Sequence, residues 1–160
     1  MHLFDFNEKS NIKDWNVVDD TVMGGRSAGN FKLDEKGHGV FYGEVSLENN
    51  GGFSSLRYNM PRKAIEGYNF LVLSLKGDGK QYQARIKQSD GDYYSYVYNF
   101  TTSGEWETVK IPLNEMEATF RGRKLNMDNF SGEFIEEFTI LIGNKKPQQF
   151  KLMLDKIELQ

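Results

Sequence analysis

The chain has 160 residues, a formal net charge of −3 and no cysteine. The lack of cysteine excludes a disulfide framework, a thiol nucleophile and a thiolate metal site, and the acidic balance argues against nucleic-acid binding, which usually needs a basic face. A chain of this length buries about 70% of its unfolded surface, so we expect one domain over residues 1–160.

Strand patterns dominate the sequence, in keeping with its 14% aromatic residues and 16 glycines. The segment 69–77 is apolar on both faces, as in a strand that is covered on each side. The segment 80–88 alternates and puts Tyr82, Ala84 and Ile86 on one face. The expected strands are 39–47, 53–60, 69–77, 80–88, 93–101, 105–112, 136–143 and 149–159.

The connections between these segments carry turn residues. Gly77-Asp78-Gly79 and Asp90-Gly91 predict short hairpins, because Gly and Asp tolerate positive φ, and Ser103-Gly104 and Lys146-Pro147 mark further turns. Only 11–15 and 113–117 suggest a short turn of helix. The pattern as a whole predicts an all-β fold, a two-sheet sandwich of the jelly-roll type.

The N-terminus has no basic start followed by an apolar run, so we expect no signal peptide and a cytoplasmic location. No apolar stretch approaches the roughly 20 residues that span a bilayer. His2 and His38 lie too far apart in the sequence to suggest a zinc site. A structural calcium ion near Asp155 is a weak alternative, because no loop has an EF-hand pattern.

The stretch DDTVMGGRSAG, residues 19–29, is the first candidate site. Two glycines before Arg26 and Ser27 could turn backbone N–H groups toward an anion, but the pattern of a phosphate-binding P-loop is missing. A structural loop that packs on the sheet is the favoured interpretation.

The stretch LENNGGFSSLR, residues 47–57, is the second candidate. Its glycines free the backbone, and Arg57 offers a planar fork of donors that suits carboxylates or phosphates. In the structural alternative, Arg57 pairs with Asp19, Asp20 or Glu48 and pins two loops together. The candidate binding residues of this stretch are Glu48, Asn49, Asn50 and Arg57.

Tyr94, Tyr96 and Tyr98 share one face of the expected strand 93–101. An exposed row of aromatic rings would form a platform for sugar rings, whereas the favoured alternative places this face in the core. Phe120 and Arg121 in ATFRGRKL could likewise form a positive edge or a solvated loop. No spacing singles out a catalytic pair among the 23 acidic residues, and no nucleophile motif surrounds either histidine, so we expect no enzyme.

Two of these stretches carry a family resemblance. DDTVMGGRS (19–27), followed by FYGEVSLENNGGFSSLR (41–57), resembles the thirty-kilodalton complex I intermediate-associated protein family. GEWETVKIPL (104–113), FRGR (120–123) and ILIGNKKPQQFKLMLDKIEL (140–159) fit in the same order. The motif residues are Asp20, Gly24, Gly25, Ser27, Glu48, Asn49, Asn50, Gly51, Gly52, Phe53, Ser55, Arg57, Phe120, Arg121 and Gly122.

The resemblance implies a galactose-binding-like β-sandwich, similar to family-eleven carbohydrate-binding modules, without catalytic residues or a cofactor. It also implies a protein partner, since mitochondrial members of the family assist the assembly of respiratory complex I. We therefore expect a protein-interaction module of the assembly-factor type, which uses the Gly-rich loops, Arg57 and Arg85. The alternative is a carbohydrate or small-ligand module that uses the tyrosine-bearing face.

Overall fold

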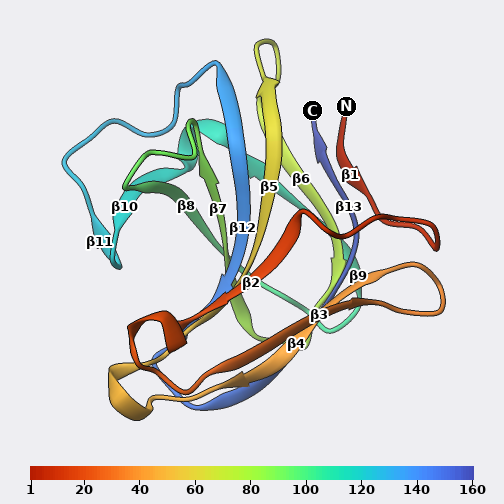
Figure 1. Cartoon of the computed structure of the whole chain (residues 1–160). Coiled ribbons are helices and arrows are strands. Elements are labelled where there is room, and N and C mark those ends of the chain that lie inside the picture. The colour runs from red at the N-terminus through yellow and green to blue at the C-terminus, as the bar shows by residue number, and fades with distance from the viewer.

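The computed structural model describes residues 1–160, apart from the side chains of Val22, Met23 and Asn50. The strands form two facing sheets, and the N- and C-termini lie close together at one end (Figure 1). The first sheet has the order β3-β4-β13-β6-β9, and β1 also pairs with β13. Its strands are β1 (His2–Asp5), β3 (Ala28–Leu33), β4 (Gly39–Val45), β6 (Phe70–Lys76), β9 (Trp106–Pro112) and β13 (Gln148–Leu159).

The second sheet has the order β11-β10-β8-β7-β12-β5-β2. Its strands are β2 (Trp15–Asp19), β5 (Ser54–Ala64), β7 (Gln81–Lys87), β8 (Ser95–Thr101), β10 (Glu117–Phe120), β11 (Arg123–Lys124) and β12 (Phe134–Ile142). Three 3-10 helices stand in the connections, η1 (Asp20–Met23), η2 (Glu48–Asn50) and η3 (Leu113–Glu115). Because consecutive strands repeatedly change sheets, as β4 to β5 and β6 to β7 do, the architecture is the expected jelly-roll sandwich.

The core lies between the sheets and is rich in aromatic rings. Trp15, only 5% exposed, stacks on Tyr58 with ring centroids 4.6 Å apart. Two rings from the first sheet and its flanking segment pack on Trp15. The ring centroid of Phe6, just after β1, lies 5.2 Å from that of Trp15, and the centroid of Phe31 on β3 lies 5.6 Å from it. The described residues contain no helix that is both long and apolar enough to cross a bilayer.

The short turn of helix expected at 11–15 is present only as one hydrogen-bonded turn, in which the Trp15 N–H donates to the Ile12 carbonyl at 3.0 Å, because Trp15 begins β2. In 113–117 only Leu113–Glu115 is helical, and Glu117 begins β10. The hairpin expected at Gly77-Asp78-Gly79 is also wrong, since this turn joins β6 to β7 in the other sheet. Gly79 does have a positive φ of 83°, but turn chemistry does not encode which sheet the next strand joins.

Candidate binding face

The carboxylate of Asp20 joins the two Gly-rich connections. It is 1% exposed and accepts hydrogen bonds from the Ser27 N–H at 2.9 Å and the Ser27 hydroxyl at 2.6 Å. It also accepts hydrogen bonds from the N–H groups of Gly52 at 2.6 Å and Phe53 at 3.2 Å. The loop after β2 and the loop after β4 therefore converge on one buried anion, which we call the Asp20 clasp (Asp20, Ser27, Gly52 and Phe53).

Two motif glycines are explained by their closeness to this clasp. A Cβ atom at Gly25 or at Gly51 would lie closer than 3.0 Å to side-chain atoms of Asp20. Burial raises the pKa of Asp20, but the hydrogen bonds from Ser27, Gly52 and Phe53 outweigh it and leave that pKa below its ordinary value of 3.8. Asp20 is therefore an anion at neutral pH, and its hydrogen bonds serve the connection between loops.

The remaining candidates of these loops surround the clasp without joining it. Arg26, Glu48 and Asn49 are exposed, and the side chain of Asn50 lies outside the described part. Arg57 does not pair with Asp19, Asp20 or Glu48, so that expectation is wrong. Its Nε lies 3.3 Å from Oε1 of Glu137, because Arg57 stands on the outward face of β5 beside β12.

The outward face of the second sheet brings two arginines together. Thr139 on β12 pairs in register with Arg57 on β5 and with Arg85 on β7. Side chains at directly opposed positions lie on the same face, so these three residues form one row across three strands, the arginine row (Arg57, Thr139 and Arg85). Glu137 stands two residues before Thr139 on the same face.

The two arginines have different partners. The Glu137 side chain is 6% exposed and pairs with Arg57, whose side chain is 38% exposed. Arg85 instead donates from Nε and Nη2 to the neutral Gln83 Oε1, at 3.0 and 2.7 Å. Burial lowers the pKa of Arg85, and the nearby Glu137 charge acts in the opposite direction. One carboxylate thus serves two partly buried guanidinium groups.

Polar atoms of the arginine row are incompletely satisfied. Thr139 is 5% exposed, and within the described residues its buried Oγ1 has no hydrogen-bond partner. The same holds for Nε of Arg57, whose approach to Glu137 lacks hydrogen-bond geometry. Most buried polar groups in folded proteins are hydrogen-bonded, so these two atoms are exceptions among the described residues.

The tyrosines lie on the opposite face of the same sheet. Tyr96 is 7% exposed and packs edge-on against Tyr94 and Phe130, while Tyr94 and Tyr98 are half-buried against the core. Burial raises the pKa of Tyr96 to about 12, with a smaller contribution from Tyr94. The core interpretation is therefore confirmed. The exposed tyrosine platform is wrong because the alternation of β8 directs Tyr96 and Tyr98 toward the other sheet, and Tyr94, just before β8, packs on Tyr96.

The hairpin of β10 and β11 presents an exposed aromatic edge. Phe120 is 37% exposed and packs edge-on against Tyr93, which is 64% exposed, at 5.2 Å. Arg121 and Gly122 have φ of 50° and 77°, which suits a tight two-residue hairpin turn, and the Arg121 guanidinium lies 5.2 Å from the Phe120 ring centroid. Tyr93 was not among the expected site residues, although it directly precedes the tyrosine row in the sequence.

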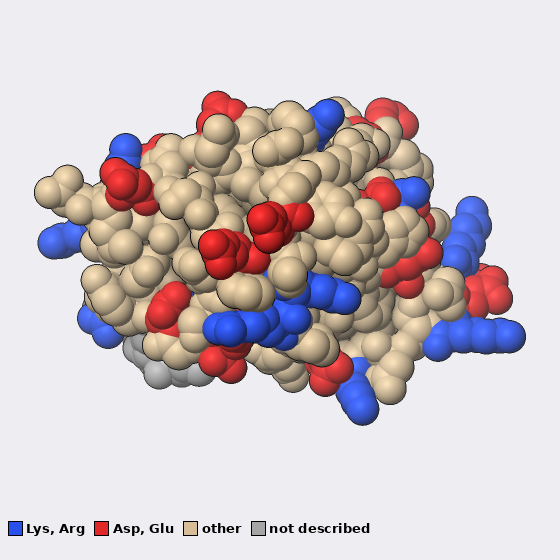
Figure 2. Space-filling view, turned by 90° about the horizontal axis from the view of Figure 1, so that it is seen from above, with Lys and Arg blue, Asp and Glu red and all other residues tan. Residues whose placement is uncertain are grey.

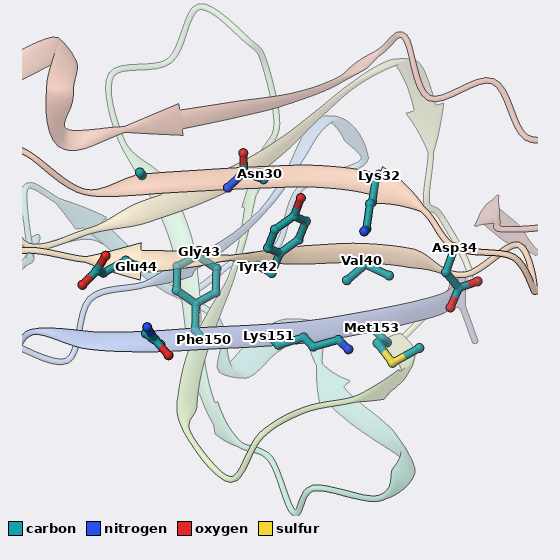
Figure 3. Close-up of a pocket in the computed structure, with 12 residues that line it drawn as sticks. Asn30, Lys32, Asp34, Val40, Tyr42, Gly43, Glu44, Phe150, Lys151 and Met153 are labelled. Carbon is teal, nitrogen blue, oxygen red and sulfur yellow. The ribbon is translucent and has the colours of Figure 1, made fainter.

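A shallow groove of about 620 Å³ crosses the outward face of the first sheet (Figure 3). Tyr42 stands out from β4 in this groove, and the Lys32 ammonium lies over its ring at 5.2 Å from the centroid. Val40 and Met153 supply the apolar floor beside it. The sequence analysis missed this groove, because its lining residues are spread over three strands without a motif.

Charge is mixed on the face of the molecule that is seen from above. Seen from above, Lys and Arg are interspersed with Asp and Glu, with broad areas of other residues between them (Figure 2). In the described part of the chain, no group of three or more His, Cys, Asp or Glu side chains is placed to hold a metal ion.

A family model described as Complex I intermediate-associated protein 30 matches residues 4–154. The chain belongs to the Complex I intermediate-associated protein 30 family. The mouse protein "Complex I intermediate-associated protein 30, mitochondrial" is 28% identical over an alignment 144 residues long, which covers 76% of this chain. The match spans 44% of the mouse protein, so it covers less than half of that relative.

This member of the Complex I intermediate-associated protein 30 family also resembles solved carbohydrate-binding modules in fold. The family 11 module of the cellulase Lic26A-Cel5E from Clostridium thermocellum is 15% identical, with a TM-score of 0.73 over 99% of this chain and 92% of the module. The family 11 module in complex with a β-1,3-1,4-mixed-linked tetrasaccharide is 16% identical, with a TM-score of 0.70 over 96% and 92%. These likenesses confirm the expected sandwich fold.

Proposed function

We propose that this domain is a non-catalytic, protein-binding module of the assembly-factor type, and that it holds its partner on the outward face of the second sheet. The observation that carries the proposal is the arginine row, where two partly buried arginines flank an unsatisfied Thr139 hydroxyl. Arginine is favoured as an interface anchor, because its planar fork forms several directed hydrogen bonds and stacks on neighbouring groups.

The family supports the kind of partner. The name of the mouse relative associates that protein with intermediates of complex I, so we propose intermediates of complex I as the partner of this domain as well. The cytoplasmic location stays a prediction, and the name of the mouse relative places that protein in mitochondria.

Carbohydrate binding is the second candidate. It is favoured by the fold likeness to a module solved with a tetrasaccharide and by the open groove that contains Tyr42. The tyrosines of β8 no longer support it, because they face the core. The outward positions of β5, β7 and β12 beside the arginine row hold Ser55, Asn59, Gln83, Lys87, Glu137 and Leu141, none of which offers an aromatic ring for sugar stacking.

The test is affinity capture from membranes and lysate of the source organism with immobilised wild-type domain and two variants. Arg57→Ala removes one member of the arginine row. Arg62→Ala is the matched control, because Arg62 lies on the same strand, is 58% exposed and pairs with Glu136. We expect the wild type and Arg62→Ala to enrich complex I subunits, and Arg57→Ala to lose at least about nine-tenths of them, a loss typical of an interface anchor.

Stability must be measured in parallel. We expect Arg57→Ala to lower the unfolding free energy by about 1 kcal/mol or less, because its ion pair is partly exposed and Arg85 still faces Glu137. Equal capture by Arg57→Ala and the wild type would contradict the proposed face. Binding to soluble glycans that is lost with Tyr42→Ala and kept with Arg57→Ala would replace it with the carbohydrate function.

A further inference from the structure

We propose that the arginine row binds a carboxylate group, and that the partner contacts it through an acidic segment of its polypeptide chain. This inference rests on the proposed function and specifies the chemistry that the face recognises. It concerns Arg57, Thr139 and Arg85 together with Glu137, the carboxylate that the protein itself supplies.

The charge of the sheet around the arginine row favours an anionic ligand. At the outward positions of β5, β7 and β12 in the paired registers stand three cations, Arg57, Arg85 and Lys87, and one carboxylate, Glu137. The outward positions of these three strands therefore carry a local positive excess, although the formal net charge of the whole chain is −3. Opposite charge on the partner would speed association and fix its orientation on the sheet.

The Arg85 guanidinium is partly buried without a carboxylate of its own. The polar contacts of Arg85 go to Gln83, a neutral acceptor, although its guanidinium is partly buried. Desolvating a cation is costly unless an anion compensates, and Glu137 is shared with Arg57. Gln83 holds two nitrogens of Arg85 and so fixes the plane of its guanidinium. A second carboxylate would complete the charge balance of the row.

The spacing of Arg57 and Arg85 across the sheet suits one carboxylate between them. Arg57 and Arg85 are each opposed to Thr139 on adjacent strands, so their Cα atoms are about 10 Å apart across the sheet. Both are long side chains, and the Thr139 hydroxyl lies between their backbones as a free donor. A carboxylate over Thr139 could accept hydrogen bonds from both guanidinium groups, and it would reach the buried Thr139 hydroxyl once the side chains that cover it move aside. Charge-assisted hydrogen bonds of this kind are the strong ones.

A polypeptide carboxylate fits better than an acidic sugar. Sugar rings bind proteins through stacking on aromatic side chains as well as through polar contacts, and the positions that flank the row are Ser55, Gln83, Lys87, Glu137 and Leu141. An Asp or Glu side chain needs only the donors that are present. The arginine row therefore suits an acidic peptide better than a uronic acid.

The experiment titrates the wild-type domain at low salt with a labelled hexaglutamate peptide, and with hexaglutamine as the uncharged probe of equal length. We expect hexaglutamate to bind at least about tenfold more tightly, and Arg57→Gln and Arg85→Gln each to weaken it by about tenfold. Thr139→Val, which keeps the shape and removes the hydroxyl, should weaken binding by about threefold to tenfold. Arg62→Gln, the matched control, should stay within about twofold of wild type, since it lies outside the row.

Glu137→Gln gives a result of the opposite sign. It removes the internal carboxylate that competes for Arg57, so it should tighten hexaglutamate binding by about threefold or more. A purely structural role for these residues would not strengthen binding. Thermal melting of each variant reports folding, and Arg57→Lys and Arg85→Lys, which keep the charge and lose the fork, should give intermediate affinities if the Gln variants unfold.

Several outcomes would overturn the inference. These are equal affinity for hexaglutamate and hexaglutamine, equal weakening by Arg62→Gln and Arg57→Gln, and weaker binding by Glu137→Gln. Tighter binding of hexagalacturonate or inorganic phosphate than of hexaglutamate would overturn the acidic peptide as the ligand. If hexaglutamate does not bind but capture of complex I subunits still depends on Arg57, the carboxylate inference is overturned and the proposed function stands. If hexaglutamate binds through the arginine row but capture does not depend on Arg57, the proposed function is overturned and the carboxylate site stands.

Discussion

Asp20 is buried as an anion because hydrogen-bond donors from two connections surround it. Removing its charge leaves the N–H groups of Ser27, Gly52 and Phe53 facing a weaker acceptor. We expect Asp20→Asn to lower the unfolding free energy at pH 7 by about 3 kcal/mol, since buried donors that lose their partner cost about 1–3 kcal/mol each. Asp128→Asn, at an exposed position, is the control and should change little.

The effect of Asp20→Asn should depend on pH. The pKa of Asp20 in the folded chain lies below 3.8, so its stabilisation is complete above pH 3.8 and is lost as the pH falls through the folded pKa. In urea unfolding followed from pH 7 to pH 2, the difference between wild type and Asp20→Asn should therefore narrow at the acid end. A constant difference over the whole range would show that the charge of Asp20 does not act as described.

At the scale of elements, the two Gly-rich connections are held by close approach to the Asp20 clasp. Gly25→Ala and Gly51→Ala would each place a methyl group against the Asp20 side chain. We expect each to cost about 2 kcal/mol, the usual size of overpacking in a tight site. Gly91→Ala is the matched control, because its new methyl group would have no heavy atom within 4 Å and the φ of Gly91 is not positive. Equal melting of all three variants would contradict the close approach.

The sequence was informative about elements wherever the pattern was long and local. The alternation of 80–88 correctly placed Tyr82, Ala84 and Ile86 on one face of a strand, and in the structure all three are buried. The short strands β1, β2 and β3 were missed, because four to six residues with interspersed polar side chains do not establish a period. β10 and β11 were missed for the same reason, at four and two residues.

The candidate site was less accessible to sequence reasoning than the fold. Arg57 and Arg85 were expected as binding residues, but their common neighbour Thr139 and the pair with Glu137 were not. These contacts join residues that are 54 (Arg85 and Thr139), 80 (Arg57 and Glu137) and 82 (Arg57 and Thr139) positions apart, through the register of β5 and β7 against β12. Register across non-consecutive strands is set by packing of the whole sandwich, and no local motif records it.

At the scale of the whole molecule, strands from both ends of the chain belong to the same sandwich. β1 pairs with β13, so the first and last strands are neighbours in one sheet. We propose that residues 1–160 form a single domain, as the length of the chain suggested. In this arrangement the Asp20 clasp fixes the loops at one edge of the second sheet, since Ser54 of β5 directly follows Phe53, while the outward face of that sheet stays open to a partner.

The central claim is that the partner sits on the arginine row and not in the groove of the first sheet. The most direct measurement is cross-saturation NMR of the labelled domain bound to its captured partner. The account predicts transfer concentrated at residues 55–59, 83–87 and 137–141. Transfer concentrated at residues 28–44 and 149–153, the outward face that contains Tyr42, would contradict it.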